Sequence, residues 1–337
     1  MASLAGVSVA TVSRILAGTY PASPGTRARV MRAVQELDYV ANAHARVLAG
    51  NNVSKSVAIV LNSVISPHYA HVAQGVEAQA TAEGRLCLIG TTGGDPKREL
   101  AIVRHMREQN AEAVILVGNV VADDKYQERM GQYAQALASV GSRLVLCGRR
   151  PLGPDVPAVV VEYDNAGGAF AATSHLLSAG HERILCLGRR PGYTTAEGRL
   201  DGYRKALAAY NVPHEPGLEA EGMMEWDEGY RMMKERLSTG PQDFTAVFAI
   251  NDLIAGGAHR ALAEHGLRVP DDVSMVGFDD LPPSRDIGLT TVHLPHEEIG
   301  RTAVRLALEH AAHGGAPPHV VLGTHLVIRD SVRPRRR

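Results

Sequence analysis

From residue 55 onward, short apolar runs alternate with amphipathic stretches, and this alternation limits the possible fold more than any other feature. Eight runs are predicted as strands, at residues 57–61, 86–89, 113–117, 144–147, 158–161, 184–187, 246–250 and 275–278. Strands that are apolar almost throughout are typical of parallel sheets covered by helices on both faces. Because the runs form two successive series, we expect an α/β body of two similar lobes.

The first 41 residues have a different texture and predict a small, all-helical head. Ser8 is a favourable N-cap, and Gly18 is expected to end the helix that begins there. A further helix is expected to begin at the N-cap Ser23, with Pro24 at its first position. The apolar faces have helical spacing and comprise Val12, Ile15 and Leu16 in one helix and Val30, Val34 and Leu37 in the other.

The segment from Ala5 to Arg14 has the pattern of a helix-turn-helix. Gly6 permits a tight turn, and burial of the apolar face leaves Ala10, Ser13 and Arg14 on the opposite face. A helix with small side chains and one arginine can lie in a major groove, where arginine pairs with guanine. Hydroxyl groups that can reach phosphates stand at Ser8, Thr11 and Ser13. A helical hairpin with a solvated arginine is the alternative interpretation.

Residues 42–50 follow the head and consist of helix-forming residues. A helix of this length is marginal by itself, so we expect it to form when docked on DNA. Leu48 would then insert as an apolar wedge into the minor groove. Packing of Leu48 against the next domain is the alternative interpretation.

The charge of the chain is close to balanced, which excludes bulk electrostatic binding of nucleic acid. The formal net charge is −1, with five arginines against Glu36 and Asp38 in residues 1–50. This segment therefore carries +3 and the remainder −4. The asymmetry is modest and allows a local basic surface on the head.

The cysteines and the apolar runs indicate a protein of the cytoplasm. Cys87, Cys147 and Cys186 each lie in a predicted strand, so we expect buried, reduced thiols rather than disulfides. No apolar run approaches the roughly 20 residues that a membrane helix needs. The N-terminus has no basic start followed by a long apolar stretch, so no export signal is expected.

The motifs of common enzyme classes are absent. The sequence has no G-x-S-x-G, H-E-x-x-H, P-loop or G-x-G-x-x-G motif. His175 and His181 bracket a predicted helix end, which indicates surface placement rather than a metal site. We therefore expect no catalytic residues, no cofactor and no metal.

Motifs along essentially the whole chain resemble the lactose-repressor/galactose-repressor (LacI/GalR) family of transcriptional regulators. The first 50 residues match at AGVSVATVSRIL, SPGTRARV and LDYVANAHARVLAG. The remainder matches at DPKRE, SAGHERI, GRLDGY, AIND, GLRVPDDVSMVGFDD and LTTVH. The resemblance implies a helix-turn-helix head joined to a two-lobed body like that of periplasmic sugar-binding proteins.

The resemblance also implies which residues contact DNA. Val9, Ala10 and Arg14 occupy the base-reading positions, and Leu48 occupies the position of the leucine that opens the central base step. The expected DNA-binding residues are Ser8, Val9, Ala10, Thr11, Ser13, Arg14, Asn42, His44 and Leu48. Family members dimerise on palindromic operators, and the leucine-heptad tail of tetrameric members is absent here. We therefore expect a homodimer on double-stranded operator DNA.

The beginning of the chain departs from the family pattern. Relatives carry several further residues before the position of Met1, and Met1 stands where they commonly have valine. A GTG codon is read as methionine only at a start, so we expect the true start to lie upstream. A head that begins at Met1 is expected to brace its recognition helix poorly and to bind DNA weakly.

The resemblance places a small effector between the lobes, where the carboxyl ends of the strands meet. The expected effector-binding residues are His68, Tyr69, Thr195, Arg199, Met224, Trp226, Asn251 and Asp279. Arg199 and Asp279 offer charge-assisted hydrogen bonds suited to sugar hydroxyls; alternatively, they pair with each other or cap helices. Met224 stands where relatives often have a stacking aromatic residue, and Trp226 is a candidate substitute.

The expected organisation is a head (1–41), a hinge helix (42–51), an N-terminal lobe (55–160 and 292–321) and a C-terminal lobe (161–291 and 322–332). Residues 333–337 are expected to form a solvated basic tail. The predicted function is a repressor in which the effector, through the lobes, controls the hinge. Three alternatives are an enzyme, a secreted solute-binding protein and a sensor with an impaired head.

Overall fold

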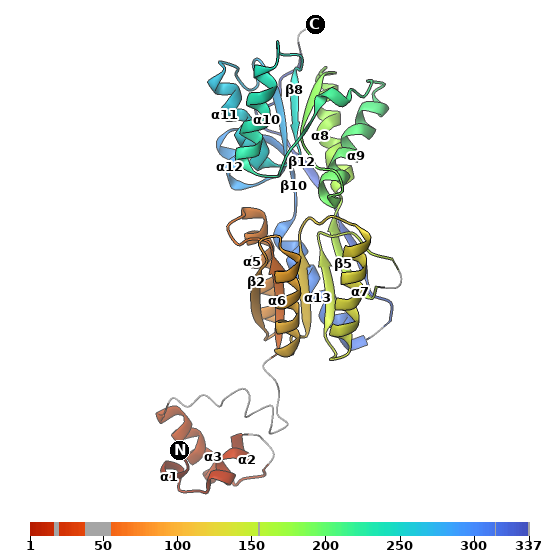
Figure 1. Ribbon diagram of the computed structural model, residues 1–337. Helices are drawn as coiled ribbons and strands as arrows, with labels where there is room; N and C mark the ends of the chain where they lie inside the picture. The colour runs from red at the N-terminus through yellow and green to blue at the C-terminus, as the bar shows by residue number, and fades with distance from the viewer. Residues whose placement is uncertain (17–19, 38–54, 154–155, 314, 336–337) are drawn as a thin grey trace.

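The computed structural model describes residues 1–16, 20–37, 55–153, 156–313 and 315–335. Two six-stranded sheets form the body, and each is covered by helices on both faces (Figure 1). Three short helices form the head. The expected α/β fold with a helical head is confirmed, and each of the eight predicted strands is present.

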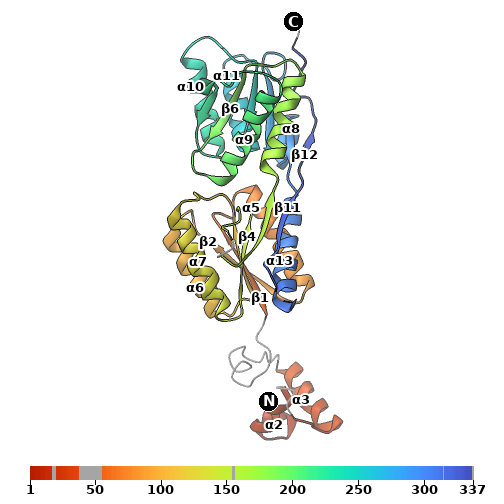
Figure 2. The same cartoon turned by 90° about the vertical axis from the view of Figure 1, so that its right-hand side faces the viewer.

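The N-terminal lobe contains a sheet in which every strand pair is parallel. Its order is β11 (His319–Leu322), β5 (Ala158–Tyr163), β4 (Arg143–Cys147), β3 (Ala113–Val117), β1 (Ser56–Leu61) and β2 (Leu86–Thr91). Figure 2 shows α5 (Pro67–Ala82) and α13 (His296–His313) on one face, with α6 (Pro96–Glu108) and α7 (Asp124–Ala138) on the other. Because both faces are covered, β1 and β3 are buried at every position and are apolar apart from Ser56 at the start of β1.

The C-terminal lobe repeats this plan with one difference. Its strand order is β12 (His325–Val327), β10 (Thr290–His293), β9 (Ser274–Asp279), β8 (Ala246–Ala249), β6 (Ile184–Arg189) and β7 (Glu219–Glu221). The pairing of β10 with β12 is antiparallel, whereas the sequence predicted only parallel sheets. The covering helices are α8 (Asn165–Ser178), α9 (Thr194–Ala209), α10 (Trp226–Ser238) and α11 (Asp252–Glu264), with two short helices η1 (Pro216–Leu218) and α12 (Pro282–Asp286).

The chain passes between the lobes three times (Figure 2). The first passage follows β5 at Asp164, the second lies between β10 and α13, and the third joins β11 to β12. The lobe boundaries expected after residues 160, 291 and 321 fall inside β5, β10 and β11, one to three residues before each strand ends. Each strand runs past the expected boundary because it stays paired within its own sheet up to the point where the chain crosses to the other lobe.

The head is built from α1 (Ala2–Ala5), α2 (Val9–Leu16) and α3 (Pro24–Glu36). Its core comprises Ala5, Val12, Ile15, Val30 and Ala33. Leu37, expected on the apolar face of α3, is 50% exposed because α3 ends there and Leu37 is its C-cap. The side chain of Arg29 donates to the carbonyl of Ala5 at 3.2 Å, which fastens α3 to α1.

Three further expectations are corrected by the structure. Cys87 is only partly buried because β2 is an edge strand, whereas Cys147 and Cys186 are buried as expected. His181 is buried rather than on the surface, with Nδ1 at Thr245 and Nε2 at the carbonyl of Arg333. The basic tail is held as well, since the backbone NH of Arg333 donates to Ser274 and its side chain pairs with Asp271.

Within the described ranges, no helix is long and apolar enough to cross a membrane.

Candidate functional site

The recognition helix α2 begins at a turn that the sequence anticipates. Gly6 adopts a left-handed conformation with φ 63°, which glycine tolerates without a steric penalty. The Oγ of Ser8 then accepts from the backbone NH of Thr11 at 3.1 Å, as an N-cap does. The turn between α1 and α2 is therefore encoded by Gly6 and Ser8.

The exposed face of α2 carries the residues predicted to contact DNA. Val9 is 76% exposed, and Ala10, Ser13 and Arg14 are exposed with it. Thr11 is partly exposed and its hydroxyl lies 2.8 Å from that of Ser8. Small side chains beside Val9 leave this face open to close approach by another molecule, as a helix in a major groove requires. Asn42, His44 and Leu48, the other predicted DNA contacts, lie outside the described residues.

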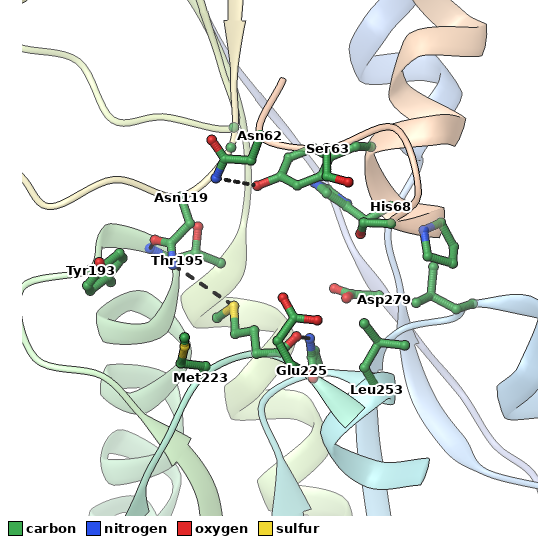
Figure 3. A pocket seen from close by; sticks show the side chains of 18 of the residues that line it. Asn62, Ser63, His68, Asn119, Tyr193, Thr195, Met223, Glu225, Leu253 and Asp279 are labelled. Carbon is green, nitrogen blue, oxygen red and sulfur yellow. Dashed lines mark hydrogen bonds between the residues drawn. The ribbon is translucent and has the colours of Figure 1, made fainter. Parts of the chain in front are cut away.

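A cavity of about 550 Å³ lies between the two lobes of the body. Figure 3 shows Asn62, Ser63 and His68 of the N-terminal lobe facing Met223, Glu225, Leu253 and Asp279 of the C-terminal lobe. All eight predicted effector residues line this cavity: His68, Tyr69, Thr195, Arg199, Met224, Trp226, Asn251 and Asp279. The carboxyl ends of the strands therefore bring together the residues that were predicted to be close.

Arg199 and Asp279 form a buried ion pair in the wall of the cavity. Nη2 of Arg199 lies 2.9 Å from Oδ1 of Asp279, and the guanidinium stacks on the ring of Phe278. Arg199 also donates to the side chain of Asn165 and the carbonyl of Ile250. Burial raises the pKa of Asp279, and Arg199 opposes that shift. The predicted alternative of mutual pairing and the cavity-lining position are thus both present.

The carboxylate of Asp279 retains acceptor capacity. Oδ1 lies 2.9 Å from Nη2 of Arg199 and accepts no other hydrogen bond within the described part of the chain. The backbone at Asp279 has φ 110°, a conformation that side-chain-bearing residues rarely adopt. A buried acceptor held in a rare conformation favours a role in ligand binding over a purely structural one.

Asn251 and its neighbour Asp252 position the loop that carries Asp279. Asn251 caps α11 by accepting from the NH of Ile254, and its amide donates to the carbonyl of Met224. Asp252 is buried and accepts from Leu281 N at 2.8 Å and Thr291 Oγ1 at 2.6 Å. Burial raises the pKa of Asp252 to about 7, and the nearby charge of Asp279 adds to the effect. Asn251 is therefore a helix cap as well as a cavity residue.

The aromatic residue Trp226 lines the cavity and is only partly covered by the rest of the chain. Its ring stacks on Tyr230 with centroids 5.9 Å apart, and the residue remains 43% exposed. Met224 lines the cavity, and its sulfur lies 4.0 Å from the amide nitrogen of Asn119. The lining thus combines flexible methionine side chains with the indole of Trp226.

Several cavity residues escaped the sequence analysis. They are Asn62, Ser63, Asn119, Tyr163, Arg190, Tyr193, Met223, Glu225, Leu253 and Leu281. Asn62 and Asn119 follow the predicted strands at 57–61 and 113–117. Asn251 was assigned to the cavity because it follows a predicted strand, and the same reasoning applies to these two residues. Arg190 follows β6 and Leu253 is the second residue of α11, whereas most of the others lie in loops.

Asn119 belongs to a clasp between the lobes. Its side chain accepts from the NH of Thr195 at 3.0 Å, and Val120 O accepts from Thr194 N at 3.1 Å. The NH of Ala122 donates to the carbonyl of Gly192, and Val121 forms an antiparallel bridge with Tyr193. We define residues 119–122 and 192–195 as the interlobe clasp.

Glycine forms the floor of the cavity at the end of β3. Gly118 has φ 102°, and a Cβ there would lie 2.6 Å from the hydroxyl of Tyr69. The ring of Tyr69 can therefore approach the sheet only because residue 118 has no side chain. Tyr69 in turn accepts a hydrogen bond from the amide of Asn62 at 3.3 Å.

Comparison with known proteins identifies both parts of the chain. Residues 1–42 match the model of bacterial regulatory proteins of the lacI family, and residues 173–332 match a periplasmic binding protein-like domain. The HTH-type transcriptional regulator CelR of Thermobifida fusca is 34% identical, over 98% of this chain and 96% of that protein.

Solved structures agree with these matches. A CelR–cellobiose complex aligns with a TM-score of 0.72 at 31% identity, covering 98% of both chains. A lac repressor dimer bound to operator and the anti-inducer ONPF aligns with a TM-score of 0.83 at 26% identity, covering 98% of this chain and 97% of that one.

The chain is a DNA-binding transcriptional regulator with a ligand-binding α/β body, and it belongs to the lacI family of bacterial regulatory proteins. The relatives are regulators and not enzymes, which agrees with the predicted absence of catalytic function. Among the described side chains, no group of three or more could hold a metal ion.

Proposed function

We propose that the protein is a cytoplasmic repressor that binds a palindromic operator as a homodimer and responds to a sugar held between its lobes. The observation that carries this proposal is the interlobe cavity, whose polar contacts come from both lobes. A ligand that touches both lobes stabilises the arrangement in which those contacts coexist.

The chemistry of the cavity favours a neutral, hydroxylated ligand. Asp279 and Glu225 offer carboxylate oxygens, while Asn62, Asn119 and Arg190 offer donors. Mixed donors and acceptors beside apolar walls suit a saccharide, which has hydroxyl groups at its edge and CH groups on its faces. The cellobiose complex of CelR supports the same class of ligand.

The proposed DNA contacts divide between bases and backbone. Val9, Ala10 and Arg14 read bases in the major groove, while Ser8, Thr11 and Ser13 contact phosphates. In the dimer, Asn42, His44 and Leu48 act at the centre of the operator. The lobes set the spacing of the two hinge segments, so closure of the cavity changes operator affinity.

Two measurements test this function. A thermal-shift screen of saccharides and nucleosides should find a saccharide that raises the melting temperature in proportion to its occupancy. Selection of oligonucleotides by the protein should then recover a palindrome, and the saccharide should change the affinity roughly 5- to 150-fold. A protein that shows no preference among DNA sequences in any ligand condition would refute the proposal.

A further inference from the structure

Three rings meet where the lobes join, beside the cavity. His68 is the second residue of α5, His296 is the first residue of α13, and Tyr163 ends β5. The Nδ1 atoms of His68 and His296 are 3.1 Å apart. The hydroxyl of Tyr163 lies 3.3 Å from the same nitrogen of His296. His68 and Tyr163 line the cavity, whereas His296 stands behind them, and both Tyr163 and His296 are buried.

A contact across the lobe junction determines the tautomer of His296. Its Nε2 lies 3.0 Å from the backbone carbonyl oxygen of Asp279. A carbonyl oxygen only accepts, so Nε2 of His296 must carry the proton and donate it. In a neutral imidazole, Nδ1 of His296 is then an acceptor. This nitrogen has a single lone pair, which faces both Nδ1 of His68 and the hydroxyl of Tyr163.

The tautomer of His68 follows from that of His296. Because Nδ1 of His296 accepts, Nδ1 of His68 must carry a proton and donate. In a neutral ring, the remaining nitrogen of His68, Nε2, has no proton and is an acceptor. Because His68 lines the cavity, the ring nitrogen that it has left for a ligand is an acceptor rather than a donor.

The surroundings keep both rings uncharged near neutral pH. Burial is the main cause that lowers the pKa of His68, and burial lowers the pKa of His296 to about 4. The charged and titratable groups that face the pair are His71 of α5, Tyr163 of β5, Arg199 of α9, Asp279 of β9 and His293 of β10. Arg199 opposes a second positive charge, and the carboxylate of Asp279 is already paired with Arg199.

We infer that His296 is a positioning residue for the effector: it holds the backbone of Asp279 and fixes His68 as an acceptor, so that the cavity selects a ligand that donates hydrogen bonds to both residues. This inference rests on the proposed function and deepens it. The bond to the Asp279 carbonyl helps to hold the rare φ of 110° at that residue. Vicinal hydroxyl groups of a sugar are the donors that match.

The same contacts join the ligand to the elements of both lobes. His296 touches α5 through His68, β5 through Tyr163 and β9 through Asp279. A ligand bound to both His68 and Asp279 adds a further connection between the two lobes across the junction. Helix α5 follows β1, the strand at the beginning of the body.

The first test needs no ligand. Long-range proton–nitrogen NMR spectra of the full chain, labelled with ¹⁵N-histidine, report the tautomer of each ring. Assignment uses His68→Gln and His296→Gln. We expect Nδ1–H for His68 and Nε2–H for His296, with both rings neutral at pH 7. The opposite tautomer of either ring, or a cationic ring at pH 7, overturns the inference.

The second test measures the affinity for cellobiose, D-galactose and D-ribose by calorimetry. His296→Phe keeps a ring but removes both nitrogens. It should lower the affinity for whichever of these saccharides binds by about tenfold, which is the effect of one lost hydrogen bond. His296→Gln restores a donor toward the Asp279 carbonyl and should recover part of that loss. His105→Gln, an exposed histidine of α6 that does not line the cavity, is the control and should leave the affinity unchanged.

The two kinds of failure are distinguishable. Equal losses for His296→Phe and His296→Gln, or no loss for either, contradict a positioning role while leaving the sugar-responsive regulator intact. If no saccharide binds the wild type, the sugar and the selection by His68 are both wrong, even where the NMR spectra show the expected tautomers.

Discussion

At the scale of single residues, the ion pair of Arg199 and Asp279 is the strongest constraint on the cavity. Both side chains are buried, so each needs the other to compensate for lost hydration. Removing one charge leaves the other uncompensated, which is more costly than losing an exposed pair. The pair therefore couples ligand binding to the stability of the C-terminal lobe.

Asp279→Asn should abolish effector binding and lower the free energy of unfolding by about 3 kcal/mol, because a buried guanidinium loses its counter-charge. Denaturant unfolding and calorimetry measure the two effects. Glu221→Gln is the control, since its ion pair with Arg189 is exposed and its loss should cost less than about 1 kcal/mol. Equal stability losses in the two variants would contradict this account.

The buried carboxyl group of Asp252 predicts a dependence of stability on pH. Its pKa is about 7 in the folded protein and 3.8 when unfolded, so the folded state binds the proton more tightly. Its contribution to stability is therefore full below pH 4 and is lost as the pH rises through 7. By linkage, the loss amounts to at most about 4 kcal/mol.

Asp252→Asn isolates this contribution, because asparagine does not titrate. The free energy of unfolding of the wild type, minus that of the variant, should fall between pH 4.5 and pH 7.5. Urea titrations at intervals of pH supply the difference. A difference that stays constant over this range would show that Asp252 does not hold its proton in the folded state.

At the scale of elements, helix α2 combines a buried apolar face with an exposed reading face. Val12 and Ile15 fasten it to the head core, which leaves Val9, Ala10 and Arg14 accessible. The N-cap at Ser8 and the turn at Gly6 set where this face begins. The specificity for DNA is therefore expected to reside in a few side chains of one short helix.

Arg14→Ala should abolish the preference among DNA sequences, because a bidentate contact with guanine contributes about 1–3 kcal/mol of discrimination. The body of this variant should bind saccharide as the wild type does. Arg32→Ala removes the same charge from the exposed surface of α3 and should lower affinity uniformly across sequences. Fluorescence anisotropy with the selected palindrome and a scrambled duplex separates the two results.

Leu48 lies outside the described residues, and its role remains a prediction from the sequence. As a wedge in the minor groove, it should contribute only where the operator is kinked. Leu48→Ala is expected to weaken binding to the palindrome by more than binding to random DNA. If titrations give the same loss for both duplexes, Leu48 has a packing role instead.

At the scale of the whole molecule, the lobes are joined by three chain passages and by the interlobe clasp. The passages connect each lobe to the other covalently, whereas the clasp depends on hydrogen bonds that can break. The cavity lies between them, so its ligand and the clasp act on the same relative motion of the lobes. The clasp is therefore expected to influence how strongly the effector controls DNA binding.

Asn119→Ala should reduce the ratio of operator affinities measured with and without saccharide by a few-fold, because it removes the contact with Thr195 that holds the lobes together. Asn62→Ala is a comparison within the same cavity, since the side chain of Asn62 bonds to Tyr69 and Thr92 of its own lobe. It should weaken saccharide binding without changing that ratio at saturation. Equal ratios in both variants would argue against the clasp.

The sequence alone determined the architecture and eight of the cavity residues. Apolar runs of strand length predicted the two parallel sheets, and parallel strands place their carboxyl ends together, so His68, Thr195, Asn251 and Asp279 could be assigned to one cavity. The recognition helix could be predicted equally well, because helix caps and helical periodicity are local features of the sequence. Such features depend on near neighbours along the chain.

Only the tertiary structure decided how distant residues meet. The pairing of His68 with His296, the clasp between residues 119–122 and 192–195, and the burial of His181 all join segments remote in sequence. The antiparallel edge strand β12 belongs to the same group. A hydrogen bond between such residues has no periodic signature, because it depends on how two finished lobes pack and not on local conformation.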